Sequence, residues 1–111
     1  MATIKSYTDL EQSEKLAEIL PVESADMCYP LPYEEGDKPL LEQGGFGSTP
    51  CWSLAALLGV LPYPTLHKTF SGWRCDSYNK EGTICKLGEP SDNPVDACYE
   101  MIIKLHEQNL L

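Results

Sequence analysis

Basic residues are scarce in this sequence. Its 111 residues include eight Lys and Arg against 17 Asp and Glu, which gives a formal net charge of −9. Nucleic-acid phosphates and acidic membrane surfaces repel such a protein unless it carries a local basic patch. The eight basic residues are scattered along the chain, so we expect no nucleic-acid and no membrane partner. By charge alone, a basic protein is the better match.

Long hydrophobic runs are also missing. The longest apolar stretch, from Leu54 to Leu61, is far too short to span a bilayer. The segment from Met1 to Tyr7 lacks the charged region and apolar run of a signal peptide. We therefore expect a cytoplasmic protein, in which cysteines stay reduced.

Closely spaced cysteine pairs are the third absence. The five cysteines are irregularly spaced, at Cys28, Cys51, Cys75, Cys85 and Cys98. Cys75 and Cys85 fall on the two arms of a predicted hairpin and could face each other, but zinc requires four ligands and favours Cys-x2-Cys spacings. The two histidines are isolated in the sequence. We expect no metal site and no cofactor.

Helix signals are clear at both ends of the chain. Thr8 with Glu11 has the pattern of a capping box, which predicts a helix over residues 9–20 that ends at Pro21. Asn93 and Pro94 predict the start of a last helix over residues 94–108.

A further helix is predicted in the middle of the chain. Ser48 or Thr49 would cap it, with Pro50 at its first position. Its residues through Leu58 are apolar on nearly every side, a pattern typical of the most buried helix of a domain.

Strands are predicted on both sides of this helix. After the helix, we predict strands over residues 65–70, 73–78 and 83–87. A hairpin turn over residues 79–82, which ends in Gly82, is predicted to join the last two. Residues 26–33 are a candidate edge strand, and residues 38–42 its possible return.

The predicted fold class is α+β, with three helices packed on one side of a small, mainly antiparallel sheet. A chain of this length is expected to form a single domain over residues 1–111. The predicted core comprises Leu54, Leu57, Leu58, Val95, Cys98, Ile102 and Leu105.

Three segments carry a resemblance to known proteins: SYTDLEQSEKLAEILPVESADM, CWSLAALLGVLPYPTLHKTFSGWRCDSYNKEG and DNPVDACYEMIIKLHEQNLL. Together they make the chain resemble a group of small proteins, without an assigned activity, from gut anaerobic bacteria and their mobile elements or prophages. The resemblance implies a dispensable accessory role in the cytoplasm and carries over no catalytic residue.

Aromatic side chains after the central helix are the leading candidates for a functional surface. Helices can cover only one face of a single small sheet, so several of these large side chains should stay accessible. The candidate binding residues are Tyr63, His67, Phe70, Trp73, Arg74 and Tyr78. The glycine-rich loop over residues 44–49 is a candidate border of the same surface.

A cysteine-dependent hydrolase is the alternative. A cysteine at a helix start has a stabilised thiolate, so Cys51 would be the nucleophile and His67 its base, oriented by Asp76 or Asn79. The segment faintly resembles the papain-type signature but lacks its spacing and its Cys-Gly-Ser. Packing of Cys51 in the core explains the same residue without chemistry.

A third possibility is an anion- or nucleotide-sequestering protein. The glycine loop before a helix could offer backbone amides to phosphate, provided that Lys68, Arg74 and Lys80 cluster in space. The sequence most favours a non-enzymatic accessory protein that binds an unknown protein or small ligand.

Overall fold

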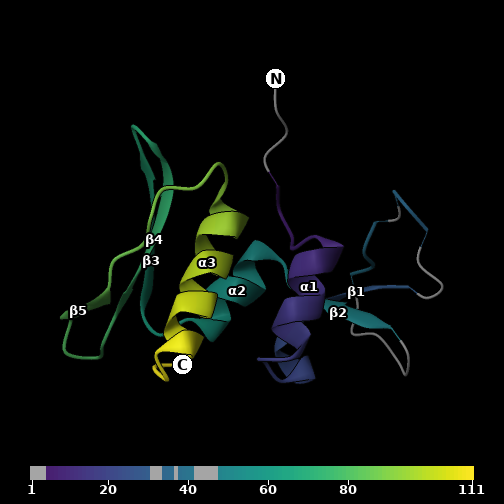
Figure 1. The fold of residues 1–111 in the computed structure, drawn as a ribbon, viewed down its shortest axis with the longest axis horizontal. Coiled ribbons are helices and arrows are strands. Elements are labelled where there is room, and N and C mark those ends of the chain that lie inside the picture. The colour runs from purple at the N-terminus through teal and green to yellow at the C-terminus, as the bar shows by residue number, and fades with distance from the viewer. Residues whose placement is uncertain (1–4, 31–33, 37, 42–47) are drawn as a thin grey trace.

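The computed structural model describes residues 5–30, 34–36, 38–41 and 48–111, and within them it confirms the α+β class. It differs from the predicted single sheet, because the strands form two separate antiparallel sheets. The three helices lie between these sheets (Figure 1). Among the described residues, no helix is long and apolar enough to cross a bilayer.

Helix α1 spans Leu10–Ala17. Its capping box exists one residue later than predicted: Asp9 is the N-cap, and its partner is Gln12 instead of Glu11. Thr8 does not act as the cap because its side chain is buried and has other partners. Its hydroxyl is hydrogen-bonded to the Ser13 hydroxyl and accepts the backbone amide of Trp52. The short 3-10 helix η1, Val22–Ser24, follows Pro21.

The smaller sheet pairs β1, Met27–Tyr29, with β2, Thr49–Cys51. Leu40 bridges to Cys28 on the other side of β1, so part of the predicted return strand is confirmed. Residues 31–33, 37 and 42 of this predicted hairpin lie outside the described residues. Helix α1 packs against β2.

The predicted start of the central helix is wrong. Residues 49–51 form β2, and α2 begins only at Leu54 and ends at Val60. Ser53 is the N-cap, where its hydroxyl accepts the Ala56 amide and is fixed in turn by Asp26. Backbone pairing of residues 49–51 with β1 therefore outweighs the helical preference of this segment.

The larger sheet has the order β3-β4-β5, with strands Pro64–Thr69, Gly72–Tyr78 and Ile84–Lys86. The predicted strands and the turn between β4 and β5 are confirmed. Phe70 lies in the turn between β3 and β4 and not at the end of a strand. After β5 the chain returns along β4, where Ser91 and Trp73 exchange two backbone hydrogen bonds of 2.7 and 2.8 Å.

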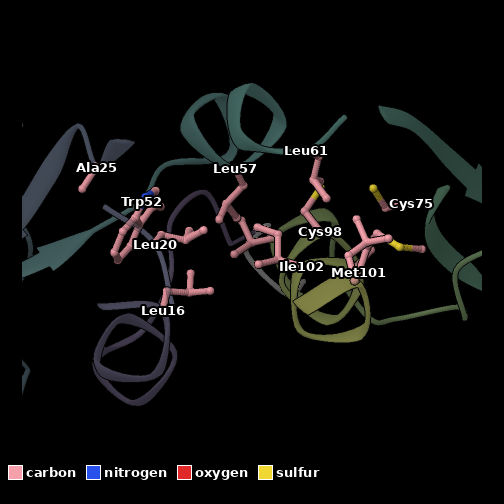
Figure 2. Packing of buried hydrophobic residues seen from close by; sticks show 13 residues of the cluster. Leu16, Leu20, Ala25, Trp52, Leu57, Leu61, Cys75, Cys98, Met101 and Ile102 are labelled. Atoms are coloured by element: carbon pink, nitrogen blue, oxygen red, sulfur yellow. The ribbon is translucent and has the colours of Figure 1, made fainter. Parts of the chain in front are cut away.

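Helix α3, Pro94–Glu107, lies at the centre of the main core, capped by Asn93 as predicted. It packs against β4 on one side and α2 on the other. Figure 2 shows Leu57 of α2 directed towards Ile102 of α3, with Cys75 of β4 beyond Cys98 and Met101, and all five belong to one core cluster. Of the predicted core, Leu57 and the four α3 residues are buried, whereas Leu54 and Leu58 are only partly buried. The central helix is therefore α3.

Candidate functional site

The six predicted binding residues lie on or next to one hairpin but in three different places. Successive strand residues point to opposite faces of a sheet. Trp73 packs against the main core, whereas its neighbour Arg74 reaches Asp76 on the other face. The candidate residues therefore do not share one face of the sheet, although Tyr63 and Phe70 are exposed.

The hairpin tip carries Phe70, whose side chain is fully exposed. Behind it, the Lys68 ammonium lies 5.7 Å from the centre of the Trp73 ring, a cation–π arrangement. Trp73 is held from the other side by its backbone pairing with Ser91. Phe70 is thus an exposed aromatic side chain on a turn that its neighbours fix in place.

The outer face, which no helix covers in Figure 1, carries a polar cluster around Asp76. The Asp76 carboxylate is only 1% exposed. It lies 3.3 Å from His67 Nε2 and 3.1 Å from an Arg74 guanidinium nitrogen, and it accepts the Gly88 amide at 2.9 Å. Arg74 Nε is buried without a hydrogen-bond partner in the described part of the chain.

The base of the hairpin holds Tyr63 and Tyr78. Together with Lys80 they line a shallow depression of about 370 Å3. Tyr63 has a positive φ of 41°, which is strained for a bulky residue, and its side chain is 61% exposed. Its carbonyl accepts the Tyr78 amide at 3.2 Å, a contact that holds the strained residue in place.

Cys51 is not at a helix start. It lies in β2, fully buried, and its thiol contacts the Thr8 carbonyl at 3.3 Å. Burial raises the pKa of the Cys51 thiol above its ordinary value. His67 belongs to the larger sheet, on the opposite side of the helices (Figure 1). The structure thus joins His67 with Asp76, as the hydrolase hypothesis requires, but separates both from Cys51.

We expect the native Cys51 thiol to react slowly with a thiol reagent at neutral pH, because a buried thiol with a raised pKa forms little thiolate. Mass-spectrometric mapping after timed labelling would measure this, with the denatured protein as the fully reactive control. Fast modification of Cys51 in the folded protein, with an acidic pH midpoint, would contradict this assignment.

The remaining candidate groups are also dispersed. Lys68 lies beside Trp73, Arg74 lies on the outer face, and Lys80 lies in the turn at the base. Residues 42–47, which include most of the glycine loop, lie outside the described residues. Cys75 and Cys98 both lie in the main core. Across the described ranges no group of three potential metal ligands is found.

Two features of the molecule escaped the sequence analysis. The first is the buried position of Asp76 at the centre of the outer cluster; the sequence indicated Asp76 only as a residue that could orient His67. A groove at the ends of the three helices is lined by residues from distant segments, with a volume of about 620 Å3. No protein-family model, curated protein or solved structure matches this chain.

Proposed function

We propose that the protein is a non-enzymatic accessory protein of the cytoplasm that binds another protein through the β3–β4 hairpin. The observation that carries this proposal is the position of β3, which is an edge strand that leads directly to the fully exposed Phe70. A dispensable accessory role agrees with the resemblance to small proteins of gut anaerobes and their mobile elements.

The edge of β3 offers backbone hydrogen bonds to a partner. Within the described residues, β3 pairs only with β4, so its other edge has no strand beside it. Six residues of strand extend for about 20 Å, enough to dock an extended segment of a partner by strand addition. Phe70 at the end of this edge then supplies an aromatic anchor.

The local charge indicates an acidic partner segment. Residues 64–87 contain four Lys or Arg and two Asp or Glu, whereas the rest of the chain contains four and 15. The larger sheet is therefore positive within an acidic protein, which reverses the expectation from net charge alone. Arg74, one of these four, and His67 are partly exposed on the outer face, where both contact the Asp76 carboxylate.

The alternatives have weaker support. The hydrolase hypothesis needs a histidine beside Cys51, and His67 lies in the other sheet. The sequestering hypothesis needs Lys68, Arg74 and Lys80 around one pocket, and these residues lie at three separate places.

A photo-reactive amino acid at position 70 would test the proposal in cells of the native host. We expect it to cross-link one or a few defined proteins, identified by mass spectrometry. Phe70→Ala should then weaken binding of the purified partner by about 30-fold, as loss of an interface anchor does. The fold should be unaffected because Phe70 is fully exposed.

Leu41→Ala is the matched control, since Leu41 is 83% exposed outside the hairpin. It should bind the partner like the wild type. Trp73→Ala with Arg74→Ala is a poorer test than the sequence suggested, because Trp73 packs on the core and Arg74 contacts buried Asp76. If Phe70→Ala binds the captured protein as the wild type does, the assignment of the hairpin is wrong.

A further inference from the structure

The shallow depression of about 370 Å3 at the base of the hairpin lies at the opposite end of β3 from Phe70. Two tyrosines line it. The Tyr78 amide donates to the Tyr63 carbonyl at 3.2 Å, so these residues are neighbours across the hairpin, one step beyond the pair Pro64 and Ser77. The depression therefore has an aromatic pair in its wall.

Tyr63 holds its ring at the surface in a costly backbone conformation. Its φ of 41° lies in the left-handed region, which Gly and Asn enter readily and bulky residues seldom do. The side chain is nevertheless 61% exposed, so burial in the core does not offset the strain. Strained residues of this kind cluster at ligand-binding sites. The strain therefore marks Tyr63 as a residue that contacts a ligand.

Asn79 and Lys80, in the turn after β4, also line the depression, and their free side-chain groups are donors. The Asn79 side-chain oxygen accepts the amides of Glu81 and Thr83, which leaves only its NH2 group for a ligand. The Asn79 carbonyl is also used, since it accepts the Gly82 amide at 3.0 Å. Within the described residues, the Lys80 ammonium has no ion-pair partner.

A proline-rich segment matches these features. Proline has no amide N–H, and a chain in the polyproline II conformation makes no internal hydrogen bonds, so its carbonyls are free acceptors. Proline rings pack on aromatic side chains, a recurring mode of recognition for such segments. An ordinary extended segment would also bring amide N–H groups, for which the Asn79 side chain has no acceptor left.

We propose that the depression binds a proline-rich, acidic segment of another protein. The prolines pack against Tyr63 and Tyr78, and the Asn79 side chain donates to a carbonyl of the segment. Lys80 pairs with a carboxylate, in agreement with the excess of basic residues over residues 64–87. This site goes beyond the proposed function, because it needs neither strand addition along β3 nor Phe70.

Three synthetic peptides of one length, with blocked ends, test the proposal. The first is a run of prolines with glutamate at each end, the second has lysine in place of the glutamates, and the third has Gly-Ser repeats in place of the prolines. Binding is followed by amide chemical shifts in the full-length protein, with Thr65, Lys80 and Gly82 as reporters. We expect the first peptide to bind at least about tenfold more tightly than either of the others.

Tyr63→Asn is the decisive variant. Asn adopts a positive φ readily and the lost ring is exposed, so the urea midpoint should not fall. Binding of the proline–glutamate peptide should weaken by at least about tenfold. Phe70→Ala is the matched control, since it removes another exposed ring from the same hairpin and should bind this peptide like the wild type.

Three results would overturn the proposal. The first is the absence of saturable binding of the proline–glutamate peptide, and the second is equally tight binding of the Gly-Ser peptide. The third is undiminished binding of the proline–glutamate peptide by folded Tyr63→Asn. None of these results bears on the proposed function, which is tested through Phe70 and a captured partner.

Discussion

Replacement of Gly88 by Ala is expected to lower the free energy of unfolding by about 3 kcal/mol. A Cβ atom at this position would lie 2.1 Å from the Cys75 carbonyl oxygen. That oxygen belongs to the backbone of β4 and cannot rotate away, so the returning chain would have to move off the sheet. The same shift would weaken the 2.9 Å hydrogen bond from the Gly88 amide to Asp76. Urea denaturation would measure the change.

Gly59→Ala is the matched control. Nothing lies within 4 Å of its added methyl group, and Gly59 is inside α2. Because Ala is the better helix former, this variant should be more stable than the wild type by about 0.5–1 kcal/mol. An unchanged urea midpoint for Gly88→Ala would show that the chain after β5 does not pass so close to β4.

Leu57→Ala is expected to lower the free energy of unfolding by about 2–5 kcal/mol, a large part of the total for a protein of this size. Leu57 is the one fully buried side chain among the described residues of α2, and it packs into the main core towards α3 (Figure 2). Truncation would leave a cavity between the two helices. The midpoint of urea unfolding, followed by circular dichroism, would report the loss.

Leu58→Ala is the control that separates the loss of core packing from the change in helix propensity. Leu58→Ala removes the same atoms from the same helix, but Leu58 is only partly buried. We expect its cost to be about half that of Leu57→Ala or less. Equal losses for the two variants would mean that α2 is rotated relative to the structure.

Local sequence signals were sufficient where neighbouring residues decide the structure. Asn93 caps α3 through its own side chain, which accepts the Asp96 amide three residues later at 2.9 Å. The turn after β4 is likewise local: the Asn79 side chain accepts the amides of Glu81 and Thr83. Such contacts depend on a few consecutive residues, so they can be predicted without knowledge of the fold.

At the start of α2, local signals gave a wrong prediction because residues distant in the sequence determine the structure there. Ser48, Thr49 and Pro50 have the composition of a helix start, yet β2 forms here because Met27–Tyr29 pairs with it. The N-terminal segment adds to this arrangement, since the Thr8 amide donates to the Trp52 carbonyl and the Leu54 amide to Ser6. No local pattern in residues 48–54 records these partners.

The same contrast between local and distant determinants applies to the candidate sites. The hairpin residues were identified because strands and aromatic side chains are visible in the sequence, but alternation places Trp73 and Arg74 on opposite faces. The groove was missed because it is formed by the ends of three helices. Its walls come from residues 19–24, 56–60 and 106–111, and only the tertiary fold brings these ends together.

The central position of α3 has a consequence for synthesis on the ribosome. The nascent chain presents α1, α2 and β4 before α3, although Ile102 and Leu105 of α3 are part of the core that covers Leu57 and Cys75. Lys5 must likewise wait for Asp96, 91 residues later, to form their 2.9 Å ion pair. Apolar surfaces of the emerging chain therefore stay exposed to solvent until α3 is complete. We expect the core to assemble late, once α3 has left the exit tunnel.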